Sequence, residues 1–243
     1  MYRMELLLES AKALSGVQGN RVTRRRFGGA YITDIRVNAE GAEVLGRSAG
    51  RYITIEGEPC DRALKVVLQK AIELFLPRRG TVLVAGLGNP DIARDSLGAE
   101  SVSRMTAFDG KRKALYVMET DIAAKTGIDT ARMVKAVAKE VAATCVLVID
   151  ALACGDPLKI GKTVQITNTG ICPGSGVDIA QPPITEEYVG VPVIAMGVPS
   201  VSELSVITGD PQHKGYLVAP PDEDLRTRIW AEVIAGAVNM IYI

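Results

Sequence analysis

The chain has 243 residues, 47% of them hydrophobic, and its 28 basic side chains balance 28 acidic ones. This length and composition suit one α/β domain with a buried core, and a net charge of zero argues against direct binding of nucleic acid. Four cysteines without Cys-x-x-Cys spacing argue against a zinc knuckle, and no apolar run approaches the roughly 20 residues of a membrane span. We therefore expect a cytoplasmic protein with reduced thiols.

The first third of the chain predicts a small antiparallel unit followed by a helix. Residues 1–27 are expected to form a helix and then a polar, basic loop, in which Arg24–Arg26 and Arg21 are interpreted as a solvated face. Residues 30–55 alternate between apolar and polar side chains around a glycine-rich turn, which predicts two antiparallel strands at a sheet edge. A helical apolar stripe covers 61–76 and ends at Pro77.

From residue 61 onward, helices and strands alternate. The further predicted strands cover 81–85, 114–118, 145–149, 163–166 and 191–196, and the further predicted helices cover 96–105, 130–141 and 222–243. Short apolar runs without alternation are typical of parallel strands that are buried on both faces. The pattern predicts a three-layer α/β fold, with a mostly parallel sheet, helices on both faces and a small N-terminal β-hairpin, in one domain over 1–243.

Two aspartates follow buried runs of this kind. Asp150 comes directly after Val-Leu-Val-Ile, and Asp95 comes after the run 81–85 and a loop. Because ligands bind beyond the carboxyl ends of parallel strands, we expect both side chains in one crevice. Asp95 taken alone is better explained as a helix N-cap, whereas a buried Asp150 is costly unless it is paired. Two close carboxyl groups share a proton, so that one can activate water while the other polarises a carbonyl.

Other polar positions give weaker signals. The segment 86–89, Gly-Leu-Gly-Asn, is not a dinucleotide fingerprint because Asp91 replaces the third glycine, and a tight turn that frees residues to line the crevice is the simpler interpretation. The loop 173–176, with Ser175 between two glycines, lacks the context of a nucleophile elbow, but its backbone amides could line a pocket.

Cysteine catalysis is a minority interpretation. Cys154 and Cys172 would need an activating base, and the single histidine, His213, lies in a polar segment. Buried apolar filling is the simpler role for both cysteines. Lys125 and Lys162 are interpreted as solvated.

Several motifs occur together in an order that resembles one family. They are Gly-Arg-Tyr-Ile-Thr-Ile-Glu (50–56), Gly-Leu-Gly-Asn (86–89), Asp-Ser-Leu-Gly (95–98), Thr-Gly-Ile-Asp-Thr (126–130), Ile-Asp-Ala-Leu-Ala (149–153), Pro-Gly-Ser-Gly-Val (173–177) and Val-Pro-Val-Ile-Ala-Met-Gly-Val-Pro (191–199). As a set they resemble the germination protease family, the endopeptidase of bacterial spores. The resemblance covers 28–243, and 1–27 matches poorly.

The resemblance implies an aspartate-dependent endopeptidase that degrades small acid-soluble spore proteins at germination, in the cytoplasm of the spore core. It places the catalytic aspartates at Asp95 and Asp150. We expect peptide substrate to be bound by the two glycine-rich segments, at Gly86, Gly88, Asn89, Gly174, Ser175 and Gly176. No metal or other cofactor is expected. The family implies a fold similar to hydrogenase-maturation endopeptidases, a homotetramer, and synthesis as a zymogen.

Two alternatives remain open at this point. A metal-assisted peptidase closer to hydrogenase maturation would need a third ligand from Glu119, Cys154, Cys172 or His213. A catalytically weak paralogue that binds peptides is motivated by the family's zymogen segment having no match in 1–27, and by a shortened stretch before the last helix.

Overall fold

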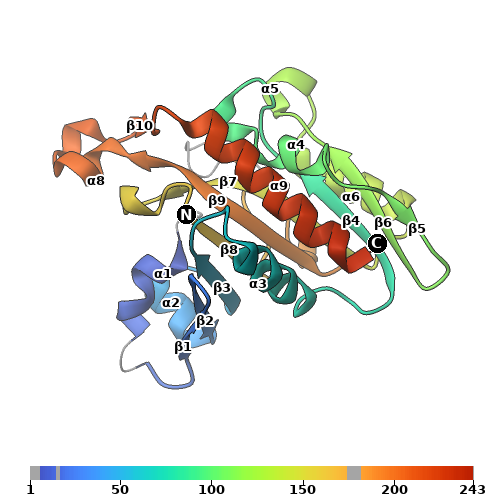
Figure 1. Cartoon of the computed structure of the whole chain (residues 1–243), viewed down its shortest axis with the longest axis horizontal. Helices are drawn as coiled ribbons and strands as arrows, with labels where there is room; N and C mark the ends of the chain where they lie inside the picture. The colour runs from blue at the N-terminus through green and yellow to red at the C-terminus, as the bar shows by residue number, and fades with distance from the viewer. Residues whose placement is uncertain (1–5, 15–16, 174–181, 243) are drawn as a thin grey trace.

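A computed structural model describes residues 6–14, 17–173 and 182–242. The described strands form one sheet in the order β1-β2-β3-β8-β9-β7-β4-β6-β5, with β10 also paired to β9 (Figure 1). The strands are β1 (Arg21–Phe27), β2 (Ala30–Val37), β3 (Gly50–Glu56), β4 (Gly80–Gly86), β5 (Phe108–Asp109), β6 (Lys113–Glu119), β7 (Cys145–Cys154), β8 (Thr163–Thr167), β9 (Val193–Glu203) and β10 (Leu217–Val218).

Helices precede, connect and follow these strands. The α-helices are α1 (Leu7–Ser10), α2 (Ala39–Leu45), α3 (Arg62–Glu73), α4 (Leu97–Val102), α5 (Ala123–Thr126), α6 (Thr130–Glu140), α7 (Glu186–Val189), α8 (Leu204–Thr208) and α9 (Glu223–Tyr242). Short 3-10 helices are η1 (Ala11–Leu14), η2 (Ala93–Asp95), η3 (Pro157–Lys159) and η5 (Pro211–His213). Among the described residues, no helix has the length and apolar character needed to cross a membrane.

The parallel part of the sheet lies at its centre. β9, β7, β4 and β6 are parallel neighbours, which confirms the predicted buried strands. Antiparallel strands extend both sides, with β8, β3, β2 and β1 on one and β5 on the other. The fold is therefore the predicted α/β class, a central parallel sheet with antiparallel flanks.

The N-terminal edge differs from the sequence prediction. The predicted hairpin strands are present as β2 and β3, but the expected loop before them forms β1, in register from Arg21 opposite Arg36 to Phe27 opposite Ala30. The expected turn between β2 and β3 contains the helix α2. β1 escaped prediction because six of its seven residues are exposed, so its sequence carries no apolar alternation.

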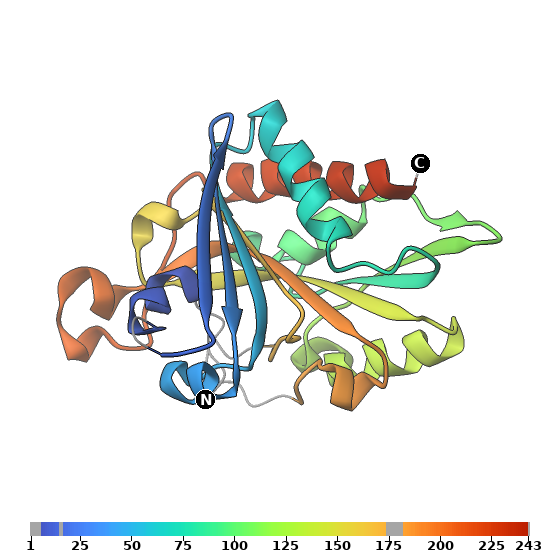
Figure 2. The ribbon, with the colours of Figure 1, turned by 90° about the horizontal axis from the view of Figure 1, so that it is seen from below.

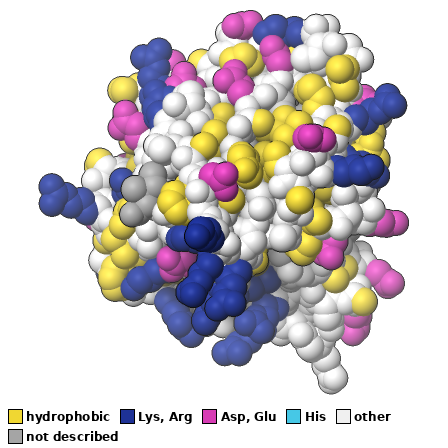
Figure 3. Space-filling model, turned by 90° about the vertical axis from the view of Figure 1, so that its right-hand side faces the viewer, with side chains coloured by type: hydrophobic (Ala, Val, Ile, Leu, Met, Phe, Trp, Pro, Cys, Tyr) yellow, Lys and Arg dark blue, Asp and Glu magenta, His cyan; other side chains and the backbone are white. Residues whose placement is uncertain are grey.

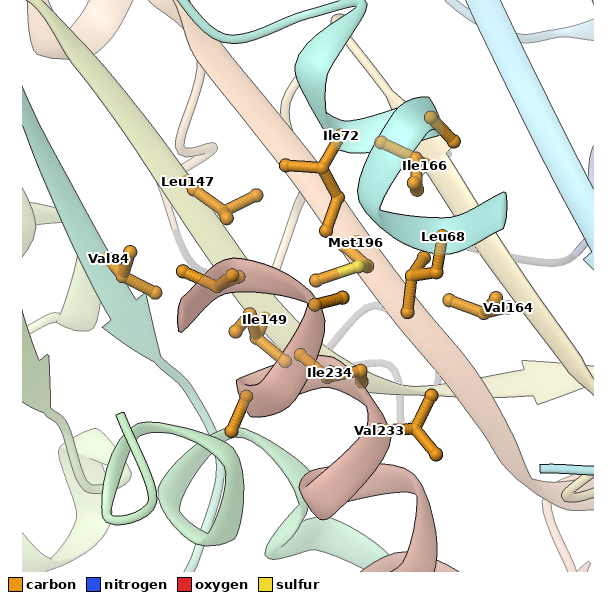
Figure 4. Close-up of a cluster of buried hydrophobic side chains, with 14 of the residues drawn as sticks. Leu68, Ile72, Val84, Leu147, Ile149, Val164, Ile166, Met196, Val233 and Ile234 are labelled. Carbon is orange, nitrogen blue, oxygen red and sulfur yellow. The ribbon is translucent and has the colours of Figure 1, made fainter. Parts of the chain in front are cut away.

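Helices cover both faces of the sheet, as predicted. Figure 2 shows α3 and α9 on one side and α6 and α7 on the other. Alternate β7 residues divide between two hydrophobic clusters: Leu147 and Ile149 pack in the cluster with α3 and α9, whereas Val146 and Val148 pack in the cluster with α6. Figure 4 shows the first cluster, in which Ile72 of α3 and Ile234 of α9 lie over Leu147 and Met196.

α4 approaches the sheet more closely than a side chain would allow. A Cβ atom added at Gly98 would lie 2.2 Å from the Leu87 nitrogen, 2.3 Å from the Leu87 oxygen and 2.6 Å from the Ile149 oxygen. All three are backbone atoms and cannot rotate away. Gly98 therefore lets α4 lie directly over the end of β4 and over Ile149 of the neighbouring strand β7.

Gly98→Ala is expected to lower the free energy of unfolding by about 3 kcal/mol or more, because the new methyl group collides with fixed backbone. Gly29→Ala is the matched control, since a Cβ there would meet only the end of the Asp61 side chain. Urea denaturation of both variants measures the difference. Equal and small losses would contradict the close approach.

Candidate active site

Asp150 lies inside β7, not past its end as the sequence predicted, because β7 continues to Cys154. Asp150 nevertheless lies just beyond the end of a neighbouring strand. β4 stops at Gly86, opposite Ile149, while β9 continues alongside with Gly197 opposite Asp150. Asp150 is thus the first β7 residue beyond the carboxyl end of β4.

The connections between these strands run in opposite directions across the sheet. The chain passes from β4 through α4 to β6, which is the neighbour of β4 on one side, and then from β6 through α6 to β7, which is the neighbour of β4 on the other side. α4 contacts α9, whereas α6 contacts α7 on the opposite face. The boundary between β4 and β7 is therefore a topological switch point, where open α/β sheets bind their ligands.

Asp95 reaches this boundary from the loop after β4. It is the last residue of η2, and its Oδ2 accepts a hydrogen bond of 2.7 Å from the Asn89 backbone N–H. The N-cap interpretation is wrong, since Ser96 occupies the cap position of α4 without a side-chain cap bond. The carboxylate of Asp95 is held by its own loop and is not used to cap the helix.

The two carboxyl groups interact and differ in their surroundings. Asp150 is 9% exposed, and burial, followed by the charge of Asp95, raises its pKa to about 8. The Ala151 N–H, 2.9 Å from Asp150 Oδ1, opposes this shift. Burial also raises the pKa of Asp95, but the Asn89 N–H and the charge of Arg94 lower it. Of the two groups, Asp150 therefore keeps a proton more readily than Asp95.

Two hydroxyl groups fix the turn that carries Asp95. Ser200 Oγ of β9 donates to the Arg94 carbonyl at 2.6 Å, and Thr227 Oγ1 of α9 donates to the Ala93 carbonyl at 3.3 Å. Thr227 Oγ1 also lies 3.0 Å from Oε1 of Glu223, which is 7% exposed. The single hydroxyl proton of Thr227 is therefore shared between the Ala93 carbonyl and the Glu223 carboxyl group. Burial raises the pKa of Glu223 to about 7, and the bond from Thr227 opposes this shift.

Lys125 ties the loop after β4 to the loop after β6. Its Nζ lies 2.6 Å from Asp91 Oδ2 and 2.7 Å from Asp121 Oδ2. Asn89 Oδ1 accepts from the Asp91 N–H at 3.0 Å and from Lys125 Nζ at 3.3 Å. The side chain of Lys125 is 39% exposed, in agreement with the solvated interpretation, and it forms these ion pairs at the surface.

Asp121 is a site residue that the sequence analysis did not select. Its charge contributes to the raised pKa of Asp95. The available signal was its position just after β6, the parallel neighbour of β4 on the side away from β7.

The predicted substrate-binding glycines have structural contacts of their own. The Gly86 carbonyl accepts from the Thr120 N–H and hydroxyl at 2.9 and 3.0 Å. A Cβ at Gly88, whose φ is +102°, would lie 2.0 Å from the backbone carbonyl oxygen of Asp95, and one at Gly86 would lie 2.3 Å from the Gly98 carbonyl oxygen. Gly88 therefore allows close backbone approach to Asp95, and Gly86 allows close approach of α4. Gly174, Ser175 and Gly176 lie outside the described residues, so their role stays a prediction.

The alternative nucleophiles and ligands lie in other surroundings. Cys154 is buried, its pKa is raised to about 12 by burial, and its Sγ donates to the Asp156 carbonyl at 3.2 Å. Burial also raises the pKa of Cys172. His213 Nδ1 is bonded to Thr208 Oγ1 at 2.9 Å. Over 6–14, 17–173 and 182–242, no three His, Cys, Asp or Glu side chains group so as to hold a metal ion.

Asp150→Asn is expected to flatten the pH dependence of stability. Folded Asp150 keeps its proton up to pH about 8, whereas the unfolded side chain releases it near the ordinary aspartate value of 3.8, so its contribution is lost as pH rises between these values. Urea denaturation across that window should show wild type losing stability relative to the variant by several kcal/mol. The exposed Asp109→Asn should follow wild type; parallel curves for all three proteins would contradict the burial.

Ser200→Ala is expected to lower the free energy of unfolding by about 1–2 kcal/mol, because the Arg94 carbonyl loses its hydroxyl donor. Ser103→Ala removes an exposed hydroxyl whose hydrogen bonds reach only the nearby Glu100 and Arg104, and it should change stability by less than about 0.5 kcal/mol. Thermal and urea denaturation compare the two. If the Ser200 variant is as stable as the control, the Ser200 hydroxyl does not stabilise η2.

The sequence has relatives over most of its length. The sequence profile of the germination protease family matches residues 4–219. The germination protease of Clostridium perfringens (strain ATCC 13124) is 33% identical over 200 residues, which are 74% of this chain and 62% of that protein. The one from Caldanaerobacter subterraneus subsp. tengcongensis is 34% identical over 231 residues, 86% of this chain and 71% of that protein.

One solved structure, the [NiFe] hydrogenase maturation protease HycI from Thermococcus kodakarensis, matches 69% of this chain and 98% of its own at 17% identity, with a TM-score of 0.41. The chain spans less than two thirds of the length of several relatives, including 59% of the germination protease from Priestia megaterium. The profile match over most of the sequence, together with this identity to named members, shows that the chain belongs to the germination protease family.

Proposed function

We propose that this protein is an endopeptidase in which Asp95 and Asp150 hydrolyse a peptide bond through an activated water molecule. One observation carries the proposal. A buried carboxyl group with a pKa of about 8 lies at the switch point of the sheet and interacts with a second carboxyl group from the loop after β4. Membership of the germination protease family supports the same activity.

The unequal pair suits a general acid and a general base. Asp95, the more ionised member, accepts a proton from water as the oxygen attacks the scissile carbonyl carbon. Asp150 donates its proton to the carbonyl oxygen, which gives a neutral tetrahedral diol. When the C–N bond breaks, the leaving nitrogen takes the proton from Asp95 and a diol hydroxyl returns one to Asp150. Both carboxyl groups then stand as they began.

The proposed substrates are small acid-soluble spore proteins, degraded during germination in the cytoplasm of the spore core. The motifs shared with the family, including Asp-Ser-Leu-Gly at 95–98 and Ile-Asp-Ala-Leu-Ala at 149–153, support this substrate class. A homo-oligomer, with synthesis as a zymogen, is part of the same proposal.

Asp95→Asn and Asp150→Asn are each expected to lower cleavage of a purified small acid-soluble spore protein by at least about 100-fold, because each removes one partner in proton transfer. The exposed Asp109→Asn should cleave as fast as wild type. Product bands on a denaturing gel over time give the rates, and circular dichroism checks that each variant is folded. Full cleavage by either site variant would refute the assignment.

The same assay separates the metal-assisted alternative. Cleavage is expected to survive a chelator, and purified active protein is expected to hold no stoichiometric metal. Loss of cleavage in chelator with recovery on adding one divalent metal would favour the alternative. Binding of the spore protein without any turnover by wild type would favour a peptide-binding paralogue.

A further inference from the structure

A groove of about 530 Å³ lies between α3 and the first three strands, well away from the aspartate pair in the sheet order. Alternate residues of β1 and β2 face it, and α3 supplies the opposite wall. Figure 3 shows lysine and arginine side chains gathered low on one face of the molecule, at the level of β1 to β3 in Figure 1. Arg21, Arg25 and Arg26, which line the groove, belong to the basic run that was interpreted as a solvated face.

The groove concentrates positive charge in a chain whose total charge is zero. Six cationic side chains line it, and Asp34 is the one carboxylate among the described lining residues. That carboxylate is already bonded to Arg51 by two hydrogen bonds of 3.0 and 2.7 Å. Arg21, Arg36 and Lys70 make no ion pair with any residue in the described part of the chain.

Three of the arginines form a row across the sheet. In the strand register, Arg21 of β1 lies opposite Arg36 of β2, which lies opposite Arg51 of β3. Side chains in such positions are about 5 Å apart at Cβ, and like charges there destabilise the sheet. Charge on an edge strand can prevent aggregation, but Arg36 lies on an inner strand. The row is better explained by an anionic partner than by protection of the edge.

Apart from Thr23, the rest of the described lining is apolar. Ile53, Val67 and Ala71 form part of it, and Leu74 of the α3 C-terminus and Phe27 of β1 are 59% and 52% exposed. A phosphate backbone has no apolar groups that could pack on such a surface. A protein segment can place apolar side chains on it and carboxylates on the arginines. The combination favours an acidic, amphipathic protein segment over a nucleic acid.

We infer that this groove is a docking site for an acidic, amphipathic segment of another protein. Carboxylates of the segment bind Arg21 and Arg36, with Lys70 on the opposite wall, and its apolar side chains cover Leu74. β8 and β9 separate these strands from β7, so the docking site is distinct from the proposed hydrolytic site and does not depend on it.

Fluorescence anisotropy with a short labelled peptide of alternating glutamate and leucine tests the inference on the full chain. Arg21→Glu with Arg36→Glu is expected to weaken binding by more than about tenfold, and Leu74→Ser by a few-fold. The matched control is Arg78→Glu with Arg112→Glu, two exposed arginines outside the groove, which should bind within about twofold of wild type. Added salt should weaken wild-type binding.

Three results would overturn the inference. One is equal loss of binding in the groove and control variants; another is equal affinity for a polyglutamate peptide without leucine; the third is tighter binding of a DNA duplex than of the peptide. Thermal unfolding checks that the glutamate variants fold. Should they not, Arg21→Gln with Arg36→Gln removes the charge without reversing it, and unchanged peptide affinity there would equally overturn the docking site.

Discussion

The hydrogen bond from the Leu87 N–H to the Ile149 carbonyl, 2.8 Å long, lies where β4 and β7 part. Up to this point the two strands are paired, and beyond it the β4 chain turns away while β7 continues. The aspartate that follows Ile149 therefore keeps one strand neighbour and loses the other. Without this divergence, Asp150 would be an ordinary interior strand position, where a carboxyl group has no use that offsets its burial.

The loop that leaves β4 is held from several directions. Its own amide at Asn89 binds the Asp95 carboxylate, β9 and α9 hold the turn through Ser200 and Thr227, and Lys125 fixes its outer part. Such convergent support limits the positions that the Asp95 side chain can take. The proposed role of Asp95 in activating water requires such a fixed orientation.

The sequence allowed good prediction wherever burial decides structure. The apolar run at 145–149 and the apolar stripe at 61–76 correspond to β7 and α3, because apolar side chains are buried in the core. β1 was not predicted because this exposed, arginine-rich strand is held by pairing with β2. Such pairing does not produce a hydrophobic pattern in the sequence.

In the candidate site, Asp95 and Asp150 could be selected from the sequence because each follows a predicted strand. The support of Asp95 by Ser200 and Thr227 was beyond prediction, since a hydroxyl's partner more than 100 residues away depends on how β9 and α9 pack. The N-cap interpretation of Asp95 failed for a related reason. A tertiary bond within the loop, from the Asn89 amide, replaced the local capping bond that propensity favours.

The buried carboxyl groups have a further consequence, for the solution around the protein. Folded Asp150 and Glu223, with pKa values raised to about 8 and about 7, are protonated in mildly acidic water, where the unfolded chain would hold both as anions. Each molecule that unfolds there sheds about two hydrogen ions, and each that refolds takes them back. A weakly buffered sample would turn more acidic as it melts, and the heat of melting would depend on which buffer absorbs the ions.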